Sequence, residues 1–325
     1  MSGQARPWTC ERWAGDVESF AFFEEFDRIE FSYEENEKLL LCTHGDQERP
    51  CYTRPLLAEL LKLFDFLRTS HSDRDQATFP LNYVVWKSST PGIWNLGGDL
   101  ALFIKLIETG DIEALRAYAH LCVEVVYQNF AKGDLPYLSI ALVQGDALGG
   151  GFEAVLSNDI VIAEEHVQFG LPEIVFNMFP GMGAYSLLAR KLSTAEARSM
   201  IMSGRLYSAK ELHDLGLIDM VAPSGAGEEG LRTFLDRNRR RHRALVSMSR
   251  VSRRCSGIDF EELIDVANIW VENAMGISSS DLRRMRRLVR AQMRRYAEGA
   301  KMCKPDVALP AHTEAAAGSS FSIER

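Results

Sequence analysis

The chain has 325 residues, with 37 Lys and Arg against 45 Asp and Glu, and a formal net charge of −8. Its hydrophobic fraction of 46% and charged fraction of 25% are typical of globular proteins and exclude disorder over most of the length. The length allows one large domain with an appendage or two smaller domains, and either arrangement buries a full core.

The six cysteines form no C-x-x-C pair and have no histidine beside them at a metal-ligand spacing. The sequence therefore predicts neither a zinc site nor a redox motif. The first thirty residues lack the apolar segment of a secretory signal, and no stretch reaches the roughly 20 apolar residues of a membrane span. We expect a cytoplasmic protein with reduced thiols and no metal.

The predicted elements alternate between strands and helices. In chain order they are a strand at 38–42, a helix at 55–67, a strand at 82–87, a helix capped by Asp99, a helix at 112–130, strands at 138–143 and 159–163, and a basic amphipathic helix at 280–297. Strands separated by helices favour a layered α/β core. The chain from residue 193 onward is mostly helical in pattern, and the tail from residue 308 has no periodicity, so we expect it to be mobile.

Two glycine clusters each follow a predicted strand and precede a predicted helix. They lie in residues 95–99 (N-L-G-G-D) and residues 145–153 (G-D-A-L-G-G-G-F-E). Glycine lets a ligand oxygen approach the backbone, and the start of a helix supplies unpaired N–H groups, so the two clusters together are able to form one anion hole. Neither cluster fits a P-loop or the G-x-G-x-x-G pattern. On the glycines alone, close packing of a strand on a helix is the favoured interpretation.

Two glutamates accompany these clusters. Glu153 lies just inside the helix that follows the second cluster, and Glu173 lies in the segment Q-F-G-L-P-E at 168–173. Glutamate is usually solvated, so the residue type by itself is weak evidence for a catalytic role.

With these motifs the sequence resembles the enoyl-CoA hydratase/isomerase, or crotonase, superfamily over residues 39–223. The resemblance rests on the G-G-D loop, the A-L-G-G-G-x-E turn, the F-G-x-P-E segment and the P-G-M-G sequence at 180–183. Within that superfamily, the segments at 94–103, 139–145, 149–154 and 179–186 are similar to the bacterial diffusible-signal-factor synthases. The long N-terminal portion departs from that pattern.

The resemblance implies an α/β fold, a crotonase-like spiral of ββα units with a C-terminal helical oligomerisation region. We therefore expect an N-terminal extension at 1–32, a core at 33–230, a helical region at 231–305 and a mobile tail at 306–325. It also implies a homotrimer or a hexamer built from two trimers.

The same resemblance implies the roles of the site residues. The backbone N–H groups of Gly98 and Gly150 would form an oxyanion hole, and the carboxyl groups of Glu153 and Glu173 would transfer protons. By analogy with hydration, Glu173 would handle the proton at C2 and Glu153 the hydroxyl at C3. For Asp99, we prefer a helix N-cap to a catalytic role.

The family match also points to an apolar tunnel for the acyl chain. Met182 and Trp270 would line it, and Gly97 would leave room near the reacting carbons, so a larger residue at Gly97 is expected to shorten the accepted chain. Core packing is an alternative for both large side chains, and for Trp270 the two interpretations are equally supported.

The resembled synthases make cis-2-unsaturated fatty acids as quorum-sensing signals from 3-hydroxyacyl groups on acyl carrier protein. The resemblance therefore implies a dehydratase that also hydrolyses the thioester and has no cofactor of its own, because its substrate is carried on phosphopantetheine or coenzyme A. A conventional enoyl-CoA hydratase or isomerase without thioesterase activity is one alternative. A non-catalytic binding protein on the same fold is another, and the family's association with a membrane sensor kinase makes such a partner an expectation.

The C-terminal helix is rich in arginine, which on most helices is simply a solvated face. The alternative is a docking surface for acidic acyl carrier protein or for the phosphates of a pantetheine substrate. The overall acidity and the absence of a recognised motif argue against nucleic acid as a partner.

Overall fold

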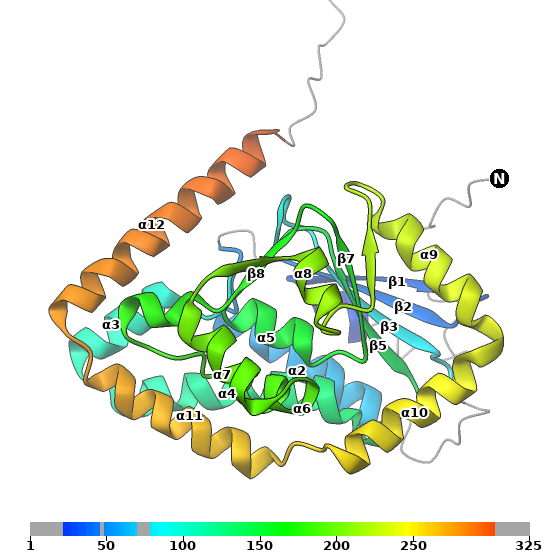
Figure 1. Cartoon of the computed structure of the whole chain (residues 1–325), viewed down its shortest axis with the longest axis horizontal. Coiled ribbons are helices and arrows are strands. Elements are labelled where there is room, and N and C mark those ends of the chain that lie inside the picture. Colours follow the sequence, from blue (N-terminus) through cyan, green and yellow to red (C-terminus); the bar gives the residue numbers. More distant parts are fainter. Residues whose placement is uncertain (1–21, 46–48, 70–78, 303–325) are drawn as a thin grey trace, which may run out of the picture.

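Two β-sheets form the centre of the computed structural model, which describes residues 22–45, 49–69 and 79–302 (Figure 1). The larger sheet has the strand order β1-β2-β3-β5-β7-β10, and all its neighbours are parallel except the antiparallel pair β1 and β2. Its strands are β1 (Ile29–Glu34), β2 (Leu39–His44), β3 (Tyr83–Ser88), β5 (Leu138–Val143), β7 (Ile160–Glu164) and β10 (Met220–Ala222).

The smaller sheet has the strand order β4-β6-β8-β9. Its strands are β4 (Ile93–Asn95), β6 (Asp146–Leu148), β8 (Gln168–Gly170) and β9 (Leu206–Ser208). Three times in succession, a strand of the large sheet is followed by a strand of the small sheet and then by a helix, as in β5-β6-α5. This repeat of ββα units confirms the predicted fold class.

Helices enclose the sheets on several sides. In chain order they are α2 (Arg54–Thr69), α3 (Leu100–Thr109), α4 (Ile112–Ala131), α5 (Gly150–Leu156), α6 (Ala184–Lys191), α7 (Thr194–Ser203), α8 (Ala209–Asp214), α9 (Gly227–Asn238), α10 (His242–Cys255), α11 (Phe260–Met275) and α12 (Ser279–Met302), with short 3-10 turns η2 (Lys132–Asp134), η3 (Pro172–Phe176) and η4 (Arg239–Arg241). Every residue of α5 is buried, so this helix lies in the interior.

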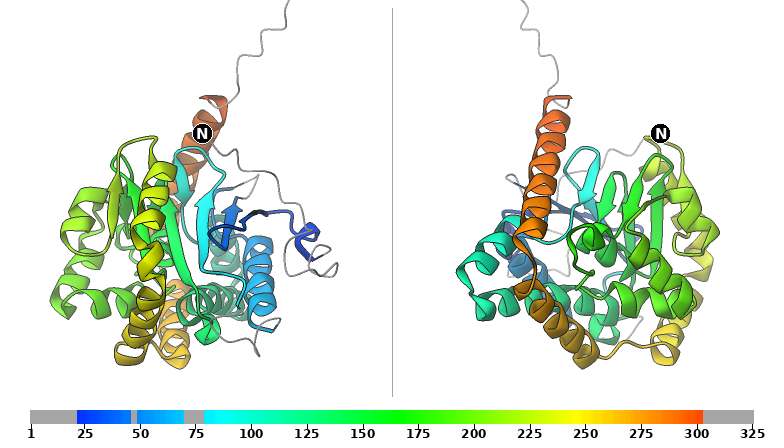
Figure 2. Two further views of the ribbon diagram at one scale, coloured as in Figure 1. Left: turned by 90° about the vertical axis from the view of Figure 1, so that its right-hand side faces the viewer. Right: turned by 60° about the vertical axis from the view of Figure 1, so that its left-hand side comes forward.

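The two faces of the large sheet pack against different helices. Alternate residues of β5 point to opposite faces, so Ile140 belongs to one apolar cluster and Ala141 to another. Side chains of α9 and α10, including Leu235 and Val246, cover the first face. Helices α2 and α4 contribute to the cluster on the other face, and Figure 2 shows α9 and α2 on opposite sides of the sheet. Burial on both faces explains why β5 is a continuous apolar run.

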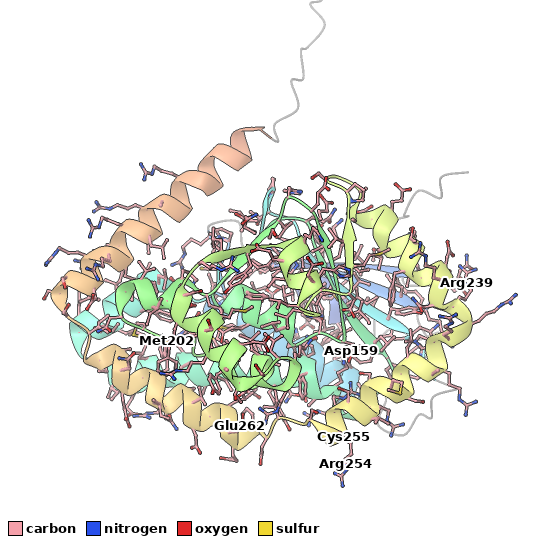
Figure 3. The ribbon with its side chains drawn as sticks, viewed as in Figure 1. Asp159, Met202, Arg239, Arg254, Cys255 and Glu262 are labelled. Carbon is pink, nitrogen blue, oxygen red and sulfur yellow. The ribbon has the colours of Figure 1, made fainter. Side chains whose placement is uncertain are left out.

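Ionic contacts fasten the later helices to this core. Lys132 Nζ donates to Asp159 Oδ2 at 2.5 Å, and Arg253 Nη1 of α10 lies 3.2 Å from the other oxygen of Asp159, a residue labelled in Figure 3. Arg190 of α6 makes two hydrogen bonds to Glu262 of α11, at 3.0 and 2.6 Å. These contacts hold α10 and α11 in place against the interior.

The strands and helices predicted from the sequence are present, with their ends moved by a few residues. The expected boundary at residue 32 falls inside β1, so the large sheet already begins at Ile29 within the segment expected to be an extension. The helical region begins at Gly227 with α9, slightly before residue 231. Residues 1–21 and the expected tail at 306–325 lie outside the described residues.

Helix α12 differs from the other helices in its position. Its first half packs on α3 and η3, whereas Figures 1 and 2 show its second half extending past the rest of the molecule. Over the described ranges, no helix has the length and apolar character that crossing a membrane requires.

Candidate active site

The turn between β6 and α5 brings backbone N–H groups to the surface of an internal cavity. Gly149 has φ +53° and ψ −130°, a conformation that favours glycine, and a Cβ atom on it would lie 2.5 Å from Oε1 of Glu173. Gly150 is the first residue of α5, so its N–H group has no partner within the helix.

The loop after β4 places a second N–H group beside the first. Gly97 has φ +90°, and a Cβ atom on it would lie 2.6 Å from the nitrogen of Gly150. A Cβ atom on Gly150 would in turn lie 3.4 Å from the nitrogen of Gly98. The two amide groups predicted to form an oxyanion hole are therefore neighbours.

Hydrogen bonds on both sides of Gly98 hold this loop. Gly97 N donates to Asn95 Oδ1 at 2.7 Å, and Asp99 N donates to Tyr118 Oη at 3.0 Å. Tyr52 N donates to Gly97 O at 2.8 Å. In contrast, neither Gly98 N nor Gly150 N donates a hydrogen bond to another of the described residues, so both are available to a ligand.

Glu153 is buried inside α5, and two backbone N–H groups donate to its side chain. Its Oε1 accepts hydrogen bonds from Met182 N and Ala184 N, each at 2.8 Å, and the residue is only 1% exposed. Burial raises the pKa of Glu153 to about 7, and the two backbone N–H groups limit that rise.

Glu173 comes from η3, on the other side of the glycine turn. Its Oε2 is buried without a hydrogen-bond partner among the described residues. Burial and then the charge of Glu153 raise the pKa of Glu173 to about 8. The pair thus favours a carboxylate at Glu153, which has two donors, and a proton on Glu173, which has none.

The two glutamates face a cavity with an empty volume of about 650 Å³. Gly98, Gly149 and Gly150 line it with them. The remaining wall is largely apolar and includes Phe103, Tyr118, Cys122, Phe176, Met182, Trp270, Met285 and Leu288. Polar groups gathered at one place in an apolar cavity are typical of a site that binds an apolar substrate and acts on one polar end of it.

Of the three residues predicted to form the acyl-chain pocket, two line the cavity and one does not. Met182 and Trp270 both line the cavity, and the Trp270 ring meets the Phe103 ring edge-on with centroids 4.9 Å apart. Gly97 is not part of the cavity lining, and a side chain there would meet the amide nitrogen of Gly150 first. The expectation that Gly97 leaves room for the substrate therefore changes to a role in bringing two amide groups together.

Asp99 caps α3, as the sequence predicts. Its Oδ1 accepts from Leu102 N at 3.1 Å and lies 2.7 Å from Nη1 of Arg49. These partners give Asp99 a structural role at the base of the Gly98 loop.

Helix α12 contributes to the cavity wall, which was not predicted from the sequence. Met285 is fully buried and lines the cavity together with Leu288. The signal was present in the apolar residues of this basic helix, whose spacing indicates a buried face.

Comparisons with known proteins identify the family of this chain. The Enoyl-CoA hydratase/isomerase family pattern matches residues 83–266, which is more than half of the chain. The chain belongs to this family.

Among curated relatives, the enoyl-CoA isomerase/hydratase fer4 of Mycosarcoma maydis is 31% identical over 180 residues, or 54% of this chain and 62% of that protein. The 2,3-dehydroadipyl-CoA hydratase of Escherichia coli is 41% identical over 85 residues, or 26% of this chain and 33% of that protein. The peroxisomal fatty acid beta-oxidation multifunctional protein AIM1 of Arabidopsis thaliana is 34% identical over 134 residues, or 41% of this chain and 18% of that protein. The chain thus matches less than two thirds of the length of each relative.

Solved structures share the fold. Enoyl-CoA hydratase from Bacillus halodurans superposes with a TM-score of 0.67 at 17% identity, covering 80% of this chain and 99% of that one. The structure of Pseudomonas aeruginosa DspI gives a TM-score of 0.56 at 22% identity, covering 71% of this chain and 88% of that one.

The raised pKa of Glu173 predicts how stability depends on pH. Its ordinary pKa is 4.5, so between that value and about 8 the folded protein holds a proton that the unfolded chain has released. The contribution of Glu173 is therefore most favourable below pH 4.5 and is lost as the pH rises through this window. Glu173→Gln should raise the free energy of unfolding by about 2–4 kcal/mol at about pH 9 and change it little at about pH 5, measured by urea denaturation.

Glu272→Gln is the matched control, because Glu272 is exposed on α11. Equal pH dependence of Glu173→Gln and the unmodified protein would contradict the buried, protonated state of Glu173.

Proposed function

We propose that this protein adds water to, and removes water from, the C2–C3 bond of an acyl thioester. The observation that carries this proposal is the placement of two buried carboxyl groups and two free backbone N–H groups around one apolar cavity. Each of these groups matches one requirement of the chemistry.

The paired amides match the charge that develops on the substrate. Removal of a proton from C2 of a thioester moves negative charge to the carbonyl oxygen, and the N–H groups of Gly98 and Gly150 are free to donate to that oxygen. Fixed donors of this kind are each worth about 2.7–4 kcal/mol of transition-state stabilisation.

The protonation states of the glutamates match hydration. Ionised Glu153 takes a proton from the water whose oxygen bonds to C3, and protonated Glu173 gives its proton to C2. In dehydration each step reverses. The C2–H bond breaks with its proton going to Glu173, and the C3–O bond breaks as Glu153 protonates the departing hydroxyl, which leaves as water.

We further propose a specific substrate and product. The protein would act on a 3-hydroxyacyl group carried by acyl carrier protein and release a cis-2-unsaturated fatty acid as a signal. The second step is hydrolysis of the thioester by a water molecule that one of the glutamates activates. The apolar wall of the cavity, to which Met285 and Leu288 contribute, supports a fatty acyl substrate.

A carrier-protein docking site is proposed on the basic face of α12. Its arginines are exposed at Arg283, Arg284, Arg287, Arg290 and Arg294. The opposite side of the same helix lines the cavity. An acidic carrier protein on this face would hold its pantetheine arm close to the cavity. The homo-oligomer and the membrane sensor kinase partner stay predictions.

Single substitutions of the two glutamates test the proposed chemistry. Glu153→Gln and Glu173→Gln keep the shape of the side chain but remove its proton transfer, so each should lower kcat for dehydration by about 100- to 10,000-fold. The assay uses purified protein with 3-hydroxyacyl carrier protein and detects the enoyl thioester and the free acid by mass spectrometry.

Glu272→Gln serves as the control and should retain full turnover. Undiminished turnover in both glutamine variants would refute the assignment of the pair. An enoyl thioester that accumulates without free acid would refute the hydrolysis step and indicate a conventional hydratase.

Charge reversal on α12 tests the docking face. The double variant Arg287→Glu, Arg290→Glu should raise KM for the acyl carrier protein substrate about tenfold, while KM for the same acyl group on free pantetheine stays constant. The carrier-dependent reaction should also weaken with added salt.

The double variant Arg250→Glu, Arg254→Glu makes the same charge change on the exposed face of α10 and should leave both KM values unchanged. An equal effect of the α12 variant on both substrates would show that carrier docking lies elsewhere.

A further inference from the structure

A second cavity, the rear cavity, lies further along α4 and α5. Cys122 of α4 lines the catalytic cavity, and Val125 and Asn129, one and two turns later, line the rear cavity. Glu153 of α5 faces the catalytic cavity, whereas Ser157, one turn later, lines the rear cavity. Residues three or four positions apart lie on the same side of a helix, so the rear cavity lies about one turn further along both helices than the catalytic cavity.

The residues that line the rear cavity are buried. Its empty volume is about 340 Å³, and none of the described residues of its wall is more than 8% exposed. Aromatic and aliphatic side chains, such as Phe64, Trp86 and Val126, make up most of that wall. Among the described residues, no charged side chain lines it.

Three buried polar atoms on this wall have no partner among the described residues. They are His44 Nε2, Trp94 Nε1 and Asn158 Oδ1. These residues come from β2, β4 and the end of α5, and each is at most 5% exposed. A buried polar atom without a partner is costly, and three on one cavity indicate an occupant that forms hydrogen bonds.

Other polar groups on the same wall are satisfied by each other. Trp86 Nε1 donates to Asn129 Oδ1 at 3.1 Å, and Asn129 Nδ2 donates to Ser157 Oγ at 2.8 Å. The three unpartnered atoms are therefore exceptions within a wall that otherwise satisfies its polar groups.

The chemistry of the wall selects a small neutral occupant. Burial lowers the pKa of His44 to about 4, so its ring is neutral at neutral pH and offers no charge to an ion. Water is able to donate and accept, and a buried water molecule typically makes about three hydrogen bonds to groups of this kind.

We propose that the rear cavity holds ordered water and exchanges it with the catalytic cavity, supplying water for hydration and receiving it after dehydration. This inference rests on the proposed function. Met285 and Leu288 line the catalytic cavity, and an acyl chain bound there would displace water from it, so water held in the rear cavity would remain in reserve for C3.

Tyr52 belongs both to the rear cavity and to the support of the site. It lines the rear cavity, and burial is the main cause of the raised pKa of its hydroxyl group, followed by the charges of Cys122 and Glu153. The same residue holds the Gly98 loop through its backbone N–H. One residue therefore contacts the rear cavity and the loop that supplies an amide of the catalytic cavity.

The first test locates the water. A high-resolution crystal structure of the unmodified protein should show water within hydrogen-bond distance of His44, Trp94 and Asn158. Trp94→Phe removes an N–H group that has no partner among the described residues, so this variant should fold normally and lose the water at that position. A dry cavity in the unmodified protein would overturn the proposal.

The second test fills the cavity. Val125→Phe should displace the water and lower kcat for hydration of an enoyl thioester by roughly tenfold, with KM for the thioester unchanged. Val251→Phe makes the same change on the exposed face of α10 and should have no effect on kcat. Trp94→Phe, which keeps the cavity volume almost unchanged, provides a second variant if Val125→Phe does not fold, and it should show a smaller loss of kcat.

The outcomes distinguish failure of the proposed water supply from failure of the proposed hydratase function. Ordered water with an unchanged kcat in both Val125→Phe and Trp94→Phe would overturn the supply of water to the reaction. An unmodified protein without any hydration activity would contradict the proposed function and the supply role together. In that case, water at the three polar atoms would still establish the occupant of the rear cavity.

Discussion

Two carboxyl groups that share one apolar cavity cannot both be charged at neutral pH without a large electrostatic cost. In this protein the cost is unequal, because Glu153 accepts two backbone hydrogen bonds and Glu173 has an oxygen with none. The inequality makes one group a base and the other an acid. Acid–base chemistry at neutral pH therefore follows from burial and from the positions of two N–H groups, with no other charged side chain lining the cavity among the described residues.

The surrounding helices fix the positions of the two carboxyl groups. Helix α5 is buried along its whole length and carries both Gly150 and Glu153, so the amide donor and the carboxyl group move as one rigid unit. The donors to Glu153 come from the turn before α6, and α6 is tied to α11 through Arg190 and Glu262. Helix α11 in turn supplies Trp270 to the cavity wall. The two carboxyl groups are thus held in place by connections that extend across the core.

Elements with a strong local pattern were predictable from the sequence. The run Leu138–Val143 is apolar because both faces of β5 are buried, and Asp99 precedes a helix as an N-cap should. Strands β4, β6 and β8 were not predicted, because each has three residues and depends on its neighbours in the small sheet for its hydrogen bonds. Strand β1 was assigned to an extension since its alternation is masked by the surrounding acidic residues.

The candidate site likewise combines features that were predictable from local sequence motifs with features that depend on tertiary structure. Its glycines and glutamates stand in recognisable motifs, so their identity was predicted from the resemblance, and their proximity is now a structural observation. The bonds from Met182 and Ala184 to Glu153 span about thirty residues of chain and have no local signal. The rear cavity depends on His44, Trp94 and Asn158, which only the tertiary structure brings together.

Exchange of the proton at C2 tests the central claim most directly. A 3-hydroxyacyl thioester incubated with the protein in deuterated water should gain deuterium at C2, and Glu173→Gln should slow this gain by at least about 100-fold while still binding the thioester. Incorporation of deuterium by Glu173→Gln at the rate of the unmodified protein would contradict the claim that this buried carboxyl group transfers the proton.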